Sequence, residues 1–494
     1  MSPSLPEPLP PRLGGVIALP LDEVAKLVGG TVEGDGHGVV VTGPVVIDGR
    51  EAQAGSLFVA FVGEHADGHD HAPQAAAEGA VAVLGTRATG LPTVVVDDPQ
   101  AALQALASHV VARVREEGRL TVLALTGSQG KTSTKDLLAA VLSDDAPTVA
   151  THGSFNNELG LPITVLRATR ETRFLVLEMG ARGIGHLRDL CRLARPDISL
   201  VLNVGKAHLG EFGTRENIAL AKGELVEALP DDGIAVLNLD DPLVAAMAGR
   251  TRARVTGFGQ ADDAELRYGD ITVDDLGRPT FVLQHHDRTE RVAMQLLGRH
   301  QAVNAAAAAA TALVTGVGLD DVATSLRNVT SLSPMRMELH ERSDGLVLVN
   351  DAYNANPDSM RAALETLAGM GGRSGRRTVA VLGEMRELGG DSPAEHAEIG
   401  RLARRLGIDL VVTVGEEARA VDVGFREAAD GPGADTPGES RWLGTLDEAL
   451  PWLRHNVSGS DLLLVKASRG ARLERVADEL LGDDPGRDRK EGST

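Results

Sequence analysis

Residues 126–133 have the types and spacing that bind a nucleoside triphosphate. An apolar run, Leu120 to Leu125, leads directly into Thr126, Gly127, Ser128, Gln129, Gly130, Lys131, Thr132 and Ser133. Glycines in such a turn let backbone N–H groups converge on phosphate oxygens, and the lysine reaches the β- and γ-phosphates. Thr132 offers a hydroxyl to Mg²⁺ at the start of a helix. The segment therefore predicts a phosphate-binding loop.

This loop departs from the usual G-x-x-x-x-G-K-[ST] pattern at one position. Leu125 stands where that pattern has its first glycine. The turn is therefore expected to be shorter than in a common GTPase. The alternative, a loop without a ligand, is disfavoured by the strand before it and the Ser/Thr-rich helix after it.

Three further residues in the same region could serve metal or acid–base chemistry. Glu178 ends the apolar run 174–177 and is a candidate metal ligand, although a lone glutamate at a strand end is more often only solvated. His208 follows another apolar run, and Lys222 lies on the next expected helix. A lysine near a metal could act as general base, as charge partner or, after reaction with CO₂, as an anionic carbamate. The spacing of these residues in the sequence does not distinguish among the three roles of the lysine.

A second group of polar residues lies about 200 positions further along the chain. Arg336 and Asp351 flank a polar run, Asn350 to Asn356, which includes Asn354. Ser468 follows a later apolar run together with Lys466. We expect these residues to form a second face that closes over the nucleotide.

The elements that must position the loop alternate between strands and helices. Strands are expected at 121–125, 173–177, 198–203 and 234–239, with helices from 132, near 184–193 and near 215–229. Such alternation indicates βαβ units and a mostly parallel sheet. Ligands of such sheets bind at the carboxyl ends of the strands, which here carry Gly127, Glu178, Asn203 and Asn238. The pattern predicts one pocket.

The chain of 494 residues is longer than one hydrophobic core usually supports. We expect an α/β protein of three domains. They are a small N-terminal α/β substrate domain (1–119), a central P-loop ATPase domain with a parallel sheet (120–330) and a C-terminal Rossmann-like α/β domain (331–494). We also expect a packed alanine-rich helix at 305–319, a surface loop at 431–440 and a disordered tail from about 483.

Composition excludes several classes of protein. Lys plus Arg number 49 against 70 Asp plus Glu, a net charge of −21, and aromatic residues make up only 2%, which argues against a nucleic-acid partner. The single cysteine, Cys191, suits a reducing compartment and excludes an intramolecular disulfide framework. We find no signal peptide and no apolar stretch long enough to span a membrane. The expected location is the cytoplasm.

Several motifs together resemble the Mur ligase family over nearly the whole chain. They are the loop 126–132, Asn156-Asn157-Glu-Leu-Gly-Leu-Pro at 156–162, Leu-Glu-Met-Gly at 177–180, the run 203–209, Ala-Lys-Gly-Glu at 221–224, the run 298–304, the run 350–360 and the run 382–389. The last two resemble the branch that adds D-alanyl-D-alanine to UDP-N-acetylmuramoyl-tripeptide. Asp48 and Arg50 resemble the family's contacts to the UDP substrate.

The resemblance implies cofactors and roles. ATP would phosphorylate the tripeptide carboxylate, and the amine of D-alanyl-D-alanine would attack the acyl phosphate. Lys131 and Thr132 would hold the triphosphate and a first Mg²⁺, with Glu178 adding to the metal site. His208 and a carbamylated Lys222 would serve a second Mg²⁺. The remaining implied contacts are Asn304, Arg336 and Asp351 to the nucleotide, and Asn156, Asn157, Asn354, Asn356 and Ser468 to substrates. The enzyme would act as a monomer.

Other functions fit parts of the sequence. A sister ligase adding the third amino acid should differ around Asp351, and a folylpolyglutamate synthetase lacks a separate UDP-binding domain. A P-loop kinase or GTPase would use the same loop but needs neither Lys222 nor a closing third domain. A nucleotide-binding scaffold without catalysis is the last alternative.

Overall fold

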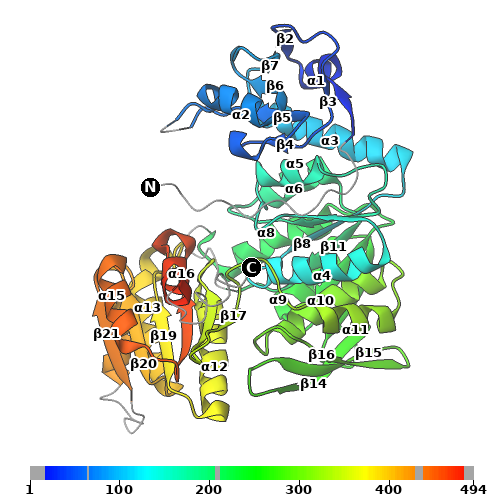
Figure 1. Ribbon diagram of the computed structural model, residues 1–494. Helices are drawn as coiled ribbons and strands as arrows, with labels where there is room; N and C mark the ends of the chain where they lie inside the picture. Colours follow the sequence, from blue (N-terminus) through cyan, green and yellow to red (C-terminus); the bar gives the residue numbers. More distant parts are fainter. Residues whose placement is uncertain (1–16, 64–65, 206–211, 429–437, 483–494) are drawn as a thin grey trace, which may run out of the picture.

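The computed structural model describes residues 17–63, 66–205, 212–428 and 438–482 and contains three larger β-sheets (Figure 1). The sheets follow one another along the chain, from the blue N-terminal part through the green centre to the yellow and red C-terminal part. This arrangement confirms the predicted α/β class. Among the described helices, none is long and apolar enough to cross a membrane.

The first sheet has five strands in the order β2-β7-β6-β5-β4, and β2 alone runs antiparallel to its neighbour. The long helix α3 connects this part of the chain to the central sheet. The elements are β1 (Leu19–Pro20), α1 (Leu21–Val28), β2 (Thr31–Glu33), β3 (Val40–Val41), β4 (Val45–Val46), β5 (Ser56–Val59), α2 (Ala72–Glu78), β6 (Ala80–Gly85), β7 (Thr93–Val95) and α3 (Pro99–Glu117).

The central sheet has nine strands in the order β16-β15-β14-β13-β12-β11-β8-β10-β9. Strands β8 to β14 pair in parallel, whereas β14, β15 and β16 form an antiparallel extension that the sequence analysis did not predict. The strands are β8 (Thr121–Thr126), β9 (Thr148–Ala150), β10 (Phe174–Glu178), β11 (Ile198–Val201), β12 (Ile234–Asn238), β13 (Arg254–Gly259), β14 (Leu266–Val273), β15 (Pro279–His285) and β16 (Arg288–Ala293).

Helices cover both faces of the central sheet, as buried parallel strands require. Along β8, Val122 and Ala124 face one apolar cluster, and Leu123 and Leu125 face the other. The first cluster includes residues of α5, α6 and α8, and the second includes residues of α4, α10 and α11. The helices are α4 (Lys131–Asp145), α5 (Gly160–Val165), α6 (His186–Ala194), α8 (Arg215–Glu227), α9 (Pro242–Ala245), α10 (Gln301–Leu313) and α11 (Leu319–Asn328).

The alanine-rich helix is shorter than predicted. Residues 305–310 are all buried alanines in α10, so this helix packs closely against its neighbours. It ends at Leu313, and Gly316 takes a positive φ of 102° before the chain starts α11 at Leu319. The prediction of one helix through Leu319 was wrong because this glycine turn separates two helices.

The third sheet has six strands in the order β17-β18-β22-β19-β20-β21, parallel except at β17. Residues 429–437 and 483–494, which include most of the predicted loop and the tail, lie outside the described residues, but Glu439 and Ser440 belong to a strand instead of a loop. The elements are β17 (Glu338–Glu341), β18 (Val347–Asp351), α12 (Pro357–Ser374), β19 (Thr378–Leu382), α13 (Ser392–Arg405), β20 (Leu410–Val414), α14 (Arg419–Glu427), β21 (Glu439–Leu443), α15 (Leu446–Asn456), β22 (Leu462–Lys466) and α16 (Glu474–Gly482).

The position of Leu125 generates a prediction about stability. Its side chain is only 1% exposed and packs in the core beneath the loop, so Leu125→Ala leaves a cavity. We expect the free energy of unfolding of the central domain to fall by about 2–5 kcal/mol. Calorimetric melting of the full chain measures this loss. Leu220→Ala, at a side chain that is 48% exposed on α8, should change stability by no more than about 0.5 kcal/mol. Equal melting temperatures of Leu125→Ala and Leu220→Ala would show that the Leu125 side chain does not contribute to the core.

Candidate active site

The predicted phosphate loop joins β8 to α4, and the side chain of Asn203 fixes its shape. Asn203 follows β11, the neighbouring strand. Its Oδ1 accepts hydrogen bonds from the backbone N–H groups of Ser128 and Gln129, both at 3.0 Å, and its Nδ2 donates to Gln129 O at 3.1 Å. The turn is therefore held in place by the adjacent strand end before any ligand binds.

Gly130 is required where the loop enters α4. Its φ of 78° is left-handed, and a Cβ there would lie 2.5 Å from Oδ1 of Asn304. Asn304 belongs to α10 and donates from Nδ2 to Gln301 Oε1 at 2.9 Å. The glycine thus lets the N-terminus of α4, with its free N–H groups, lie against α10.

Two lysines bring positive charge to this region. Lys131 Nζ donates to Gly127 O at 2.8 Å, and burial lowers its pKa while the Glu178 carboxylate opposes that shift. Burial lowers the pKa of Lys222 well below its ordinary value, and the charge of Lys131 adds to the effect. Lys222 is 4% exposed. Burial and the charge of Lys131 thus both favour the neutral form of the Lys222 amine.

Glu178, at the end of β10, carries an unsatisfied carboxylate oxygen. Asn156 Nδ2 donates to its Oε1 at 2.7 Å. Its Oε2 is buried and has no hydrogen-bond partner among the described residues. A buried carboxylate oxygen without a partner is unfavourable until a cation, a water molecule or another donor satisfies it. Glu178 therefore fits a metal ligand, and the buried hydroxyl residue Thr132 lines the same cavity.

The third domain contributes a cation and an ion pair to the opposite side. The guanidinium of Arg336 stacks 4.2 Å from the ring centre of Tyr353, and its buried Nε has no partner among the described residues. Asp351 Oδ2 forms an ion pair with Lys466 Nζ at 2.5 Å, and Asp351 Oδ1 accepts from Met337 N. The Tyr353 hydroxyl is hydrogen bonded to Ser154 of the central domain. These contacts join the two domains.

One cavity of about 370 Å³ lies between these groups. Both domains supply its wall, so most of the predicted site residues meet there although they are far apart in sequence. The predicted residues that line it are Ser128, Gln129, Gly130, Lys131, Thr132, Ser133, Asn156, Asn157, Glu178, Asn304, Arg336, Asp351, Asn354 and Asn356.

Two of these asparagines also have structural roles. Asn157 Oδ1 accepts from the Gly160 backbone N–H at 2.9 Å, at the start of α5. Asn356 caps α12, since its Oδ1 accepts from Ser359 N and Ser359 Oγ accepts from Asn356 N. Their conformations are therefore fixed independently of a ligand.

Other predicted residues lie outside the cavity wall. Thr126 donates to Met179 O and supports the loop from below. Asn238, predicted at the same pocket, instead donates to Leu202 O. Ser468 is buried and bonds to the backbone of Ala355 and Arg386.

Asp48 and Arg50 lie in the N-terminal domain, where they form an ion pair at 2.6 Å. The arginine lowers the pKa of the Asp48 carboxyl. His208 falls outside the described residues.

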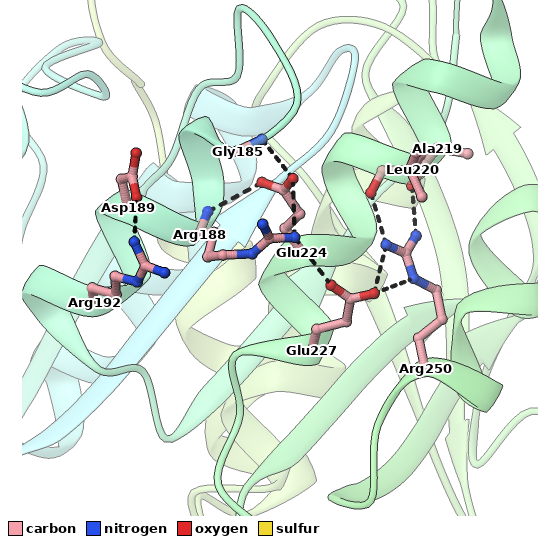
Figure 2. A network of polar contacts seen from close by, with 9 residues as sticks. All are labelled: Gly185, Arg188, Asp189, Arg192, Ala219, Leu220, Glu224, Glu227 and Arg250. Atoms are coloured by element: carbon pink, nitrogen blue, oxygen red, sulfur yellow. Dashed lines mark hydrogen bonds and ion pairs between the residues drawn. The ribbon is translucent and has the colours of Figure 1, made fainter.

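Lys222 belongs to α8 and does not line the cavity; a network of polar contacts lies around this helix (Figure 2). The buried carboxylate of Glu224 accepts from the backbone N–H groups of Gly185 and Arg188, so it caps the N-terminus of α6. Arg250 donates to the carbonyls of Ala219 and Leu220 and pairs with Glu227. A Cβ on Gly223 would lie 1.8 Å from Arg250 Nη1. The Ala-Lys-Gly-Glu motif thus combines a buried amine, space for an arginine and a helix cap.

The sequence analysis missed several residues of the cavity wall. They are Ser154, Arg182, His186, His300 and Tyr353. His300, just before α10, has its pKa lowered by burial. None of these belongs to a general nucleotide motif. Tyr353 could have been found, because it lies inside the polar run 350–356 and is one of only 2 tyrosines in the chain.

Three family descriptions match the chain. Residues 44–124 match the catalytic domain of the Mur ligase family, residues 125–312 the Mur ligase middle domain, and residues 335–469 the Mur ligase glutamate ligase domain. These matches cover the strands of the three large sheets except β2.

Individual proteins agree with this result. The chain is 45% identical to the UDP-N-acetylmuramoyl-tripeptide--D-alanyl-D-alanine ligase of Mycobacterium tuberculosis, over 95% of this chain and 99% of that protein. A crystal structure of MurF from Acinetobacter baumannii has a TM-score of 0.81 and 29% identity, covering 95% of this chain and 100% of that one. A crystal structure of MurF from Thermotoga maritima in complex with ADP has a TM-score of 0.73 and 28% identity, covering 90% and 98%. The chain therefore belongs to the Mur ligase family.

Proposed function

We propose that this protein is an ATP-dependent ligase that joins D-alanyl-D-alanine to the terminal carboxylate of UDP-N-acetylmuramoyl-tripeptide. The observation that carries most weight is the 45% identity over 95% of the chain to a ligase named for this reaction. The cavity supports it physically, because cationic groups from two domains converge where a triphosphate and an acyl phosphate would need them. The proposed product is the pentapeptide precursor of peptidoglycan.

The proposed reaction has two steps. A carboxylate oxygen of the tripeptide attacks the γ-phosphorus of ATP, and ADP leaves, which gives an acyl phosphate. The amine of D-alanyl-D-alanine then attacks the acyl carbon, loses a proton, and inorganic phosphate departs as the amide forms. Activation is needed because the carboxylate oxygen is otherwise a very poor leaving group.

The chain's own residues support the first step. Lys131 and the N–H groups at the start of α4 bind phosphate oxygens, and the arrangement of Ser128 and Gln129 by Asn203 prepares the loop for them. Asn304, Arg336 and Asp351 hold the nucleotide from the side of α10 and the third domain. Closure of the two domains around the substrates excludes water, which would otherwise hydrolyse the acyl phosphate.

The proposed function also includes a Mg²⁺ site. Thr132 and the unpartnered Oε2 of Glu178 fit Mg²⁺ because both offer hard oxygen ligands. Bound Mg²⁺ would neutralise negative charge as the carboxylate and the γ-phosphate approach. We propose two such ions, the second bound by His208 and a carbamate on Lys222. The lowered pKa of Lys222 supports carbamylation, since a neutral amine is the form that reacts with CO₂.

The remaining assignments complete the proposal. Asp48 and Arg50 bind the UDP part of the substrate, and Asn156, Asn157, Asn354 and Asn356 contribute to substrate binding. Ser468 contributes indirectly, through its hydrogen bonds to the backbone of Ala355 and Arg386. The domain boundaries are residues 1–119, 120–330 and 331–494, and the enzyme acts as a cytoplasmic monomer. The buried thiol of Cys191, whose pKa burial raises to about 12, plays no part in the chemistry.

The substrate choice can be tested directly. Purified protein with Mg-ATP and UDP-N-acetylmuramoyl-tripeptide should release phosphate only when D-alanyl-D-alanine is added, because the acyl phosphate then has its amine acceptor. Phosphate release and mass spectrometry of the pentapeptide product measure this. Equal turnover with a single diamino acid and a UDP-linked dipeptide would instead identify the sister ligase.

The role of Lys222 generates a second test. Lys222→Ala removes the proposed carbamate, so kcat should fall by about 100-fold or more. Short-chain carboxylates such as acetate should restore part of the lost activity. The matched control Lys26→Ala, at an exposed lysine on α1, should keep full activity and show no response to acetate. Full activity of Lys222→Ala would contradict the carbamate.

A further inference from the structure

Two histidines and a glutamate meet in the antiparallel part of the central sheet, away from the nucleotide cavity. Glu265 precedes β14, His285 ends β15, and His286 follows it in the turn to β16. One ligand atom from each lies within 4.8 Å of the others. None of the three lines the cavity described above.

The register of the sheet explains why these side chains meet. Phe258 pairs with Leu266, and Leu266 pairs with His285. Residues directly opposite one another on neighbouring strands share a face of the sheet. Phe258 and Leu266 belong to the apolar cluster that includes the alanines of α10. His285 therefore continues the face that packs on α10, at the point where this helix ends.

A second cavity of about 360 Å³ opens beside these residues. Its wall includes Arg254, Glu265, His285, His286 and the last turn of α10 with the following residues, from Leu313 to Gly316. Gly316 has no side chain to fill this space. The carbonyl end of a helix carries partial negative charge, so the cavity favours a cation.

The glutamate is already oriented for binding. Thr256 donates to Oε2 of Glu265 at 2.5 Å, which leaves Oε1 facing His285 Nε2 at 3.9 Å. Arg254 also contacts Oε1, at 3.0 Å, but its side chain is 61% exposed. An ion pair at such an exposed side chain is weak, so the arginine can turn into solvent when a stronger cation takes the oxygen.

The turn brings the second imidazole beside the first. The ring centres of His285 and His286 are 4.2 Å apart. His286 has a positive φ of 55°, a conformation that a non-glycine residue seldom adopts. Histidine is among the non-glycine residues that adopt this conformation more often than others, and here the turn places its ring next to that of His285.

We propose that Glu265, His285 and His286 bind a divalent transition-metal ion such as Zn²⁺. Two imidazoles and one carboxylate are a donor set that Zn²⁺ accepts, with water completing the coordination from the cavity. Mg²⁺ prefers oxygen ligands, so this site is chemically distinct from the one at Glu178. The ion ties the β15–β16 hairpin to the sheet next to α10, the helix whose other end carries Asn304.

Metal binding by the full chain tests the proposal. Protein stripped of metal is titrated with Zn²⁺ by calorimetry, and with Co²⁺ by its visible absorption. Excess Mg²⁺ occupies oxygen-rich sites, and nucleotide is left out because it would chelate Zn²⁺. We expect a single Zn²⁺ to bind and Co²⁺ to give the spectrum of a site with nitrogen ligands.

Variants separate this site from adventitious binding. His286→Asn removes one ligand while asparagine tolerates the left-handed turn, and we expect the affinity for Zn²⁺ to fall by at least about tenfold. Glu265→Gln should have a similar effect. His37→Gln, an exposed histidine of the N-terminal domain, is the control and should bind as the parent does. Circular dichroism and melting without metal verify that each variant is folded. Absence of Zn²⁺ binding, or unchanged affinity in folded His286→Asn, would overturn the proposal.

Discussion

The burial of polar and ionisable groups that lack a partner is the constraint on which this structure depends. Lys131 and Lys222 are close enough for the charge of Lys131 to lower the pKa of Lys222, and burial lowers the pKa of both amines. Arg336 adds a buried guanidinium nitrogen without a partner among the described residues. Such groups are unfavourable until they are neutralised. In the function proposed above, a triphosphate supplies negative charge to the cationic groups when it binds. Glu178 presents a buried carboxylate oxygen, Oε2, that has no hydrogen-bond partner among the described residues. This oxygen suits a cation that, in the proposed function, binds together with the nucleotide.

Close contacts between elements bring these charges together. Gly130 allows Asn304 to approach the phosphate loop, and Gly223 allows Arg250 to cross α8 beside Lys222. Asn203 follows β11 and fixes the loop relative to this strand, because its Oδ1 accepts hydrogen bonds from the backbone N–H groups of Ser128 and Gln129. Each of these contacts joins elements distant in sequence. The geometry of the site is therefore a property of the packed sheet and its helices, and the loop acquires its shape from them.

The interface between the central and third domains also depends on contacts between residues that are distant in sequence. The guanidinium groups of Arg336 and Arg469 both lie over the ring of Tyr353, whose hydroxyl is hydrogen bonded to Ser154 across the interface. The ring can accept cations on its faces while its hydroxyl contacts the other domain. Asp351 and Lys466, at the ends of paired strands β18 and β22, form the ion pair beneath this contact. Together they hold the cavity-lining residues of the third domain opposite the phosphate loop.

The sequence by itself determined the α/β class, the glycine-rich loop between a strand and a helix, and many of the residues that line the cavity beside it. Those features depend on local patterns: apolar runs of strand length, a glycine-rich turn before a helix, and polar residues after successive parallel strands. Only the tertiary structure decided that Asn238 and Ser468 bond to backbone groups instead, and that Tyr353, Arg182 and His186 line the cavity. It also decided that the alanine-rich stretch divides at Gly316 and that β14 to β16 run antiparallel. Side-chain direction, burial and hydrogen-bond partners are set by neighbours far away in the chain, and no local pattern of residues encodes them.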